Sequence, residues 1–324
     1  MKKQHTFNLI PVLILTLLCS FTIAQDDDDD DLGTDKLAQT GMKFLSFSPD
    51  ARAAALGDAI TAKQGGASSL FYNPAGMARV EGMNVSFGQT QWIAEISYQA
   101  AGFAYASNAG VLGLSFMSVN YGDLQGAVRS SAESGYTDNG TFSPTATAVG
   151  LGYAFAPTDR FSVGLHVKIA SEDLGVATVD ADGGTKKLDM STPAYDFGLM
   201  YQMDWKNLML AMSARNFSQS LKYAEEAFEL PLTFRMGVSA DVANNLSVSF
   251  VNERPRDYFT TYRVGLEYSV MEMMDIRAGY VTPSDEAGIN LGVGFKMAGF
   301  GVDVSYTDFG VFDSVMRFGL NYTL

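Results

Sequence analysis

Apolar and polar residues alternate one by one through much of the chain, most clearly in its last third. In the segment 262–270 the even-numbered residues are apolar or aromatic, and the odd-numbered ones are small, polar or charged. The segment 289–297 repeats this pattern with the opposite parity. A period of two places the two sets on opposite faces of a β-strand. Because the polar face carries charges such as Arg263 and Glu267 in mid-strand, it must be solvated or paired.

Similar runs recur from Asn84 to the C-terminus. The sequence predicts fourteen of them, at 84–91, 95–106, 110–121, 144–156, 160–171, 194–203, 207–217, 231–242, 245–253, 258–270, 273–282, 287–297, 300–308 and 314–324. Short connections follow the even-numbered runs, whereas the long gaps 122–143, 172–193 and 218–230 follow odd-numbered ones. An even strand number with short turns at one end is typical of outer-membrane barrels. We therefore predict an all-β membrane protein, a 14-stranded antiparallel transmembrane β-barrel with an N-terminal plug.

The first residues are typical of an export signal. Lys2 and Lys3 precede an apolar stretch at 9–23 that is short for a membrane span, and the small residue Ala24 follows it. A run of aspartates comes next and predicts a solvated tail. The predicted divisions are a signal peptide cleaved near Ala24 (1–24), an acidic disordered tail (25–32), an N-terminal plug or hatch (33–82) and the barrel (83–324).

Composition argues against several classes of function. The full sequence has a formal net charge of −14, which disfavours nucleic acid as a partner. Its single cysteine, Cys19, lies in the signal; the large residue Leu18 before it disfavours lipidation, which the sequence alone does not decide. No ligand cluster predicts a metal or another cofactor. His166 has no nucleophile in an elbow motif beside it, so we predict a protein that is not an enzyme.

Charged residues recur on the polar faces of the predicted strands. The candidates for a charge network in the lumen are Arg235, Arg263, Glu267, Arg277 and Arg317. Because both signs are present, we expect them to pair with one another and with the plug. A selective aqueous pore is the alternative interpretation.

Two strands interrupt the alternation, the second and the third. In the third, the apolar positions change parity within Ser115, Phe116, Met117 and Ser118. One inserted residue exchanges the two faces of a strand, which is what a β-bulge does. We therefore predict a bulge here. It would be either an ordinary twist in the wall or a kink that forms a lateral opening beside the plug.

The segments 44–58 and 69–77 carry the motifs of a known family. The first contains Ser48-Pro49-Asp50-Ala51-Arg52-Ala53-Ala54-Ala55-Leu56-Gly57, and the second contains Asn73-Pro74-Ala75-Gly76. They resemble the N-terminal signature of the PorV/PorQ family, outer-membrane barrels of Bacteroidetes that are similar in architecture to the FadL fatty-acid transporter. The resemblance implies a FadL-like barrel with a plug motif at Asn73, Pro74, Ala75 and Gly76, and a link to type IX secretion.

Two functions are compatible with this sequence. The first is a non-enzymatic component or cargo-binding accessory of type IX secretion, in which Tyr136, Phe142 and Leu174 of the long outer loops would contact protein partners. The alternative is a FadL-like channel for uptake or export of hydrophobic small molecules. Both place the protein in the outer membrane of a Gram-negative bacterium, in contact with its lipid.

Overall fold

The structure is a computed structural model. It describes residues 39–324 apart from 132, 179–184, 223–226 and 285–287. The chain divides into the units 1–37 and 38–324, and the described residues belong to the second. The predicted signal peptide and acidic tail therefore lie outside the described residues.

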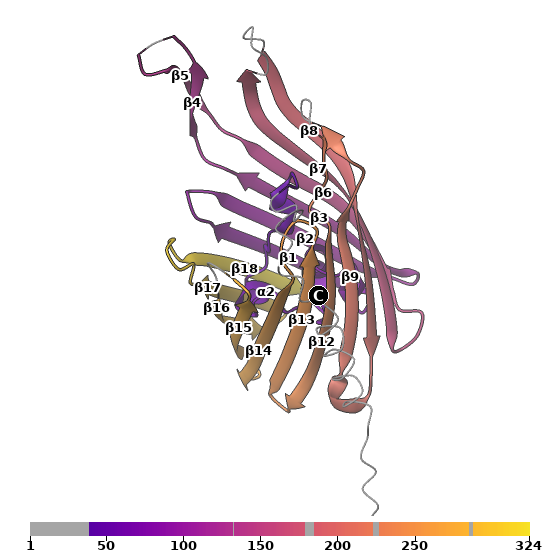
Figure 1. The fold of residues 1–324 in the computed structure, drawn as a ribbon. Helices are drawn as coiled ribbons and strands as arrows, with labels where there is room; N and C mark the ends of the chain where they lie inside the picture. The colour runs from indigo at the N-terminus through magenta and orange to yellow at the C-terminus, as the bar shows by residue number, and fades with distance from the viewer. Residues whose placement is uncertain (1–38, 132, 179–184, 223–226, 285–287) are drawn as a thin grey trace, which may run out of the picture. The chain divides into compact units, whose positions relative to one another are not determined.

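Fourteen antiparallel strands close into a barrel, in the order β1-β18-β17-β16-β15-β14-β13-β12-β9-β8-β7-β6-β3-β2 (Figure 1). Their bounds are β1 Met83–Gln91, β2 Ser97–Ser107, β3 Gly110–Asn120, β6 Thr145–Phe155, β7 Phe161–Thr178, β8 Thr185–Gln202, β9 Met209–Phe217, β12 Thr233–Ala243, β13 Leu246–Pro255, β14 Thr261–Met271, β15 Met274–Thr282, β16 Ile289–Met297, β17 Phe300–Thr307 and β18 Val315–Thr323. The prediction of a closed 14-stranded barrel is confirmed.

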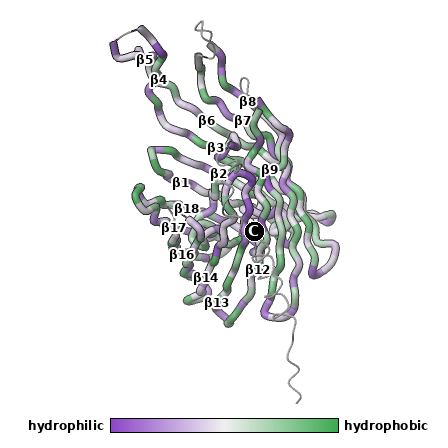
Figure 2. Tube along the Cα trace, viewed as in Figure 1, coloured by the Kyte–Doolittle hydropathy of each residue, from purple (hydrophilic) through white to green (hydrophobic). Residues whose placement is uncertain are grey.

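Hydrophobic and hydrophilic residues alternate along the strands (Figure 2), and the burial of the side chains shows that the apolar set faces outward. In β18, Met316, Phe318 and Leu320 are 45%, 52% and 53% exposed. Val315, which precedes Met316, and Arg317, which lies between Met316 and Phe318, are buried. A surface of this kind suits the hydrocarbon core of a bilayer, because closure leaves no strand edge with unpaired backbone groups. Among the described residues, no helix is long and apolar enough to cross a membrane.

The long predicted loops contain further strands. The gap 122–143 holds the hairpin of β4 (Leu124–Arg129) and β5 (Tyr136–Phe142), which extends beyond the barrel in Figure 1. Most of the gap 172–193 is taken by the extended ends of β7 and β8, and a third gap holds β10 (Leu221–Lys222) and β11 (Ala227–Phe228). We call this end of the barrel the loop end and the opposite one the turn end.

The predicted bulge in β3 is wrong. Its pairing with β2 and with β6 continues without a register shift through Ser115, Phe116, Met117 and Ser118. Met117 and Val119 face inward and are 4% and 0% exposed, so the inner face of this strand is itself apolar. The change of parity therefore marks a place where apolar side chains meet the segment inside the barrel, and it does not mark a β-bulge.

Residues 39–82, which we call the hatch segment, lie inside the barrel. They form η1 (Lys43–Ser46), α2 (Ala51–Ala55), η2 (Gly66–Phe71) and η3 (Pro74–Met77), where η denotes a 3₁₀-helix. Asp50 caps α2, since its Oδ1 accepts hydrogen bonds from the backbone N–H groups of Arg52 and Ala53 at 2.7 and 3.4 Å. The side chains of α2 pack on β15 to β18, and η3 packs on β6, β7 and β8.

Inward-facing glycines let the hatch backbone approach the wall. At Gly279 an added Cβ would lie 2.1 Å from the backbone N of Gly57 and 2.2 Å from the carbonyl carbon of Leu56. At Gly164 it would lie 2.3 Å from the backbone of Pro74 and of Ala75. A strand that carried any side chain at these positions would hold the hatch segment farther away.

Replacing Gly279 by alanine should therefore destabilise the folded protein. Overpacking of this kind typically costs about 1–3 kcal/mol, and the clash is with backbone that has no rotamer to change. Urea unfolding in lipid vesicles, followed by tryptophan fluorescence, measures the difference. Gly301→Ala is the matched control, because a Cβ there meets Asn321 only at 3.5 Å, an ordinary contact. Equal stability of the two variants would contradict the close approach.

Candidate functional site

The Asn73-Pro74-Ala75-Gly76 motif joins the hatch segment to the wall. Asn73 is 2% exposed and caps η3, since its Oδ1 accepts from the backbone N–H of Ala75 at 3.1 Å. Its Nδ2 donates to the carbonyl oxygens of Thr61 in the hatch segment (2.9 Å) and Leu199 in β8 (3.3 Å). Pro74 occupies the first helical turn, where no N–H is needed. The motif thus stabilises the start of η3 and also attaches the hatch segment to the barrel wall.

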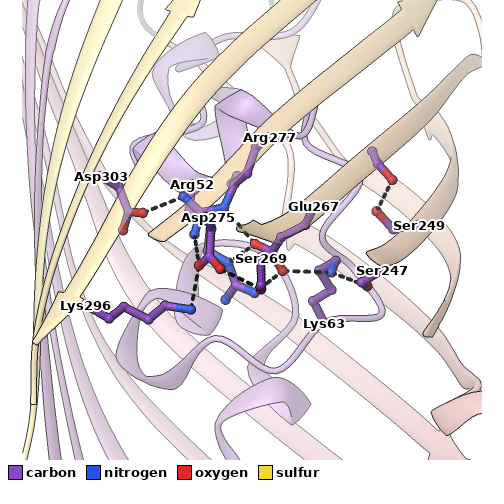
Figure 3. A network of polar contacts seen from close by, with 12 residues as sticks. Arg52, Lys63, Ser247, Ser249, Glu267, Ser269, Asp275, Arg277, Lys296 and Asp303 are labelled. Carbon is purple, nitrogen blue, oxygen red and sulfur yellow. Dashed lines mark hydrogen bonds and ion pairs between the residues drawn. The ribbon is translucent and has the colours of Figure 1, made fainter. Parts of the chain in front are cut away.

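A network of ion pairs holds the opposite side of the hatch segment (Figure 3). Glu267 of β14 accepts two hydrogen bonds of 2.9 Å from the Arg52 guanidinium and one of 3.2 Å from Lys63, both in the hatch segment. Arg277 of β15 donates to the same carboxylate at 2.7 Å. It also reaches Asp275 at 2.9 Å and Asp303 at 2.6 Å. A buried charge is tolerated only with such partners, so wall and hatch segment depend on each other here.

A second group lies nearer the loop end. Arg235 and Arg263 both pair with Glu253, and Arg263 reaches Asp58 of the hatch segment at 3.5 Å. Four of the five charged residues named from the sequence thus lie in ion pairs: Arg235, Arg263, Glu267 and Arg277. The fifth, Arg317, has no carboxylate within ion-pair distance among the described residues, and lies over the rings of Phe47 and Trp92.

The beginning of the hatch segment is tied to the loop between β13 and β14. Asp257, which is 2% exposed, accepts hydrogen bonds from the Thr40 hydroxyl at 2.6 Å and from the Lys43 ammonium at 2.9 Å. Burial acts to raise the pKa of Asp257, but these donors outweigh it and the pKa lies below its usual value. The carboxylate is therefore ionised at neutral pH and secures this end of the segment.

Apolar side chains line much of the inner wall from β2 to β8 toward the loop end, beside the buried polar residues Glu172 and Thr192. Tyr98, Met117 and Val119 face a row of alanines, Ala146, Ala148, Ala170 and Ala194, and all are buried. They form one cluster with Met42, Phe44 and Leu45 of the hatch segment. Porin lumens are polar and filled with water. This part of the lumen differs from them because apolar side chains line it.

A cavity of about 420 Å³ lies at the loop end of β6, β7 and β8. Its lining is polar apart from Met190 and includes Thr145, Glu172 and Asp189. It lies on strand ends that carry an exposed ion pair of Lys187 with Asp173. Its chemistry therefore differs from that of the apolar part of the inner wall.

Ser115, His166 and Asp196 form a buried chain across β3, β7 and β8. Ser115 Oγ lies 2.8 Å from His166 Nε2, and His166 Nδ1 donates to Asp196 at 2.9 Å. A Cβ on Gly150 of the intervening β6 would lie 2.2 Å from His166 Nε2, so only glycine leaves room for this contact.

The hydrogen-bonded residues Ser115, His166 and Asp196 are connected as in a catalytic triad, but the groups around them differ from those of a catalytic site. Asp196 is also bound by the Lys168 ammonium at 2.7 Å and by the backbone N–H of Asn216 at 2.7 Å. Ser115 lies in the middle of β3, between β2 and β6. Among the described residues around it, the backbone N–H groups are engaged in strand pairing, so they form no oxyanion site. Within the described ranges, no group of three or more His, Cys, Asp or Glu side chains is placed to hold a metal ion.

The outer-loop residues named from the sequence lie apart from the lumen. Tyr136 and Phe142, in the β4–β5 hairpin, are 53% and 39% exposed, and Leu174 is half-buried near the end of β7. Sequence reasoning did not identify the partners Glu253 and Asp275, or the aromatic residues Phe47 and Trp92. The inward parity of the two carboxylates was readable from the strand pattern, but the residues that they meet depend on the closure of the barrel.

Comparison with known proteins was made on sequence and on structure. No protein-family model matches the sequence, and no curated protein matches it. Solved structures do. The toluene transporter TbuX of Ralstonia pickettii matches with a TM-score of 0.62 at 15% identity, over 86% of this chain and 98% of TbuX. The fold is that of FadL-like transporters.

Two further structures support this assignment of the fold. The toluene transporter TodX of Pseudomonas putida matches with a TM-score of 0.61 at 12% identity, over 89% of this chain and 98% of TodX. A Pseudomonas aeruginosa FadL homologue matches with a TM-score of 0.54 at 11% identity, over 85% of this chain and 98% of its own. At such identities the similarity concerns the fold, and function must be argued from the site.

Replacing Glu267 by glutamine should loosen the hatch segment strongly. The change leaves Arg52, Lys63 and Arg277 with too little negative charge, and breaking a buried pair costs about 3–5 kcal/mol. Limited proteolysis of the folded protein should then cut within 39–82 faster than in the native chain. The control is Asp204→Asn, which breaks an exposed ion pair with Arg160 in a turn. Unchanged proteolysis of Glu267→Gln would show that this network does not hold the segment.

Proposed function

We propose that this protein is a non-enzymatic outer-membrane channel of a Gram-negative bacterium that admits small hydrophobic molecules. The observation that carries the proposal is the apolar inner wall of β2 to β8 above the hatch segment. Apolar solutes gain about 0.8 kcal/mol for each methylene removed from water, so such a wall favours them over sugars or ions. The FadL-like fold, shared with two toluene transporters, supports the proposal.

The hatch segment would control passage along this wall. Its apolar end, with Phe44 and Leu45, forms part of the wall cluster, whereas Arg52 and Lys63 hold its other side on charged strands. A solute that enters from the loop end would pass the half-buried Phe47, Trp92 and Tyr121 and then meet Met42, Phe44 and Leu45. Small displacements of these side chains open apolar space without breaking the ion pairs. The hatch segment therefore acts as a gate for apolar solutes and as a barrier to ions.

Uptake by whole cells tests this proposal. Gram-negative cells with intact lipopolysaccharide, which slows hydrophobic solutes, should take up labelled toluene faster when they express this protein. Val119→Thr adds a hydroxyl to the wall and should lower the uptake rate by about two- to tenfold, since an unpaired buried hydroxyl is unfavourable. Val270→Thr, on the outer face of β14, is the isosteric control. Uptake equal to that of cells without the protein would overturn the proposal.

A role in type IX secretion is the second candidate, and the β4–β5 hairpin favours it. Leu124, Val128, Tyr136 and Phe142 of this hairpin are all exposed. A two-stranded ribbon of this kind is marginally stable in water and gains from a partner. The motifs that resemble the PorV/PorQ family point in the same direction. In this function the barrel would present the hairpin to a secreted protein or to another secretion component.

Shortening the hairpin separates the two functions. In a host with type IX secretion, deletion of 125–141 should abolish attachment of secreted cargo to the cell surface and leave toluene uptake unchanged. Replacing the exposed Thr137 by serine is the control for the hairpin. Normal cargo attachment by the deletion variant, present at native levels in the outer membrane, would exclude the secretion function for this hairpin.

A further inference from the structure

The outward faces of β6, β7 and β8 change from apolar to polar at one level. On the side of the turn end the outward residues are apolar, for example Val149, Ile169 and Phe197, which are 56%, 49% and 50% exposed. In β7 this apolar alternation runs from Phe161 to Ile169, which is nine residues, and a tilted strand needs about 9–11 residues to cross hydrocarbon. The change therefore marks the outer boundary of the hydrocarbon core on these three strands.

Two rows of polar side chains follow on the loop-end side of this boundary. The strand register aligns them across β6, β7 and β8 as Thr147, Ser171 and Ser191 in the first row and Thr145, Asp173 and Asp189 in the second. We call these six residues the polar rows. They share the parity of Val149 and Ile169 within their strands and therefore face away from the lumen. They supply most of the lining of the cavity of about 420 Å³.

The charges of the second row favour neutral polar groups over free anions. The Lys187 ammonium lies 2.9 Å from Asp173 and 3.3 Å from Asp189. Two carboxylates with one ammonium leave this row acidic, which disfavours a phosphate. Carboxylate oxygens accept hydrogen bonds, and the hydroxyls of the first row both donate and accept them. A sugar ring, whose hydroxyl groups point in several directions, matches this set.

We propose that the polar rows bind the saccharide headgroup of an outer-leaflet glycolipid whose acyl chains lie on the apolar outer face of β6 to β8. The occupant follows from continuity with the lipid-facing surface. Val149 and Thr147 are consecutive outward positions of β6, as Ile169 and Ser171 are of β7. A lipid that covers the apolar residues of these pairs therefore places its headgroup beside the polar ones. The inference goes beyond the channel proposed above and shares with it only the location in an outer membrane.

Native mass spectrometry of the whole protein tests this inference. The detergent is lauryldimethylamine oxide, which has no sugar to compete for the site. The probes are lipid A without its phosphates, phosphatidic acid, which has acyl chains and no sugar, and the deacylated glucosamine disaccharide. We expect the dephosphorylated lipid A to bind at least about tenfold more tightly than phosphatidic acid, because several hydrogen bonds to its sugars are formed. The disaccharide should bind weakly, since it lacks the acyl chains.

Variants of the polar rows test the role of their hydroxyl groups. The double variant Thr145→Val, Thr147→Val keeps the shape of both side chains and should weaken binding of dephosphorylated lipid A by about 5- to 50-fold. It should change binding of phosphatidic acid by less than about twofold. Ser191→Ala tests the same cavity from β8, with an expected loss of about two- to tenfold. Thr282→Val is the matched control, because Thr282 is exposed at the loop end of β15, outside the cavity.

Each outcome supports or overturns the inference. Tighter binding of the glycolipid that the double variant weakens, with heat-modifiable gel migration retained to show that the variant is folded, supports it. Equal binding of phosphatidic acid, or glycolipid binding that the double variant leaves unchanged, overturns it. Binding of the free disaccharide as tight as that of the glycolipid also overturns it, since the site would then take a soluble sugar. All three negative results leave the proposed channel standing, because the polar rows face away from the lumen and toluene uptake is measured separately.

Discussion

Closure of the antiparallel ladder is the constraint on which the rest of this structure depends. Hydrocarbon offers backbone N–H and C=O groups no partner, so strands can span it only in a ring without edges. Closure with a period of two sends every second side chain into the lumen. Residues that lipid cannot accept, such as Arg277 and Glu267, must therefore be paired inside. The hatch segment supplies part of that pairing through Arg52 and Lys63.

The lumen is divided into two chemically different sides, and the hatch segment matches both. Strands β12 to β18 present charges, and Arg52 meets Glu267 there. Toward the loop end, strands β2 to β8 present alanines and larger apolar residues, and Phe44 and Leu45 pack on them. The same strands also carry the buried polar residues Ser115, His166, Lys168 and Asp196. Ion pairs resist displacement more than apolar contacts between side chains do, because a broken buried pair leaves a bare charge. This asymmetry indicates the side along which an apolar solute would move.

The structure separates what the fold supplies from what individual residues supply. TbuX and the FadL homologue share this barrel at 15% and 11% identity, so the fold alone does not select a substrate. In the proposed channel, the apolar part of the wall would favour hydrophobic solutes. The same lumen also contains the chain Ser115–His166–Asp196, whose hydrogen bonds join three strands and lie next to Lys168. These hydrogen bonds hold the three strands together.

The sequence by itself determined the strands, their alternation and the parity of their connections, because a two-residue period is a local property. It also indicated which charges face inward. It could not tell whether an apolar residue faces lipid or the hatch segment, so the inward-facing Met117 and Val119 were misread as evidence of a bulge. Nor could it separate Arg277 from Arg317, which look alike in their strands. Asp303, 26 residues from Arg277, completes one site, while Phe47 and Trp92 border the other. Such distant pairings exist only once the ring has closed around the hatch segment.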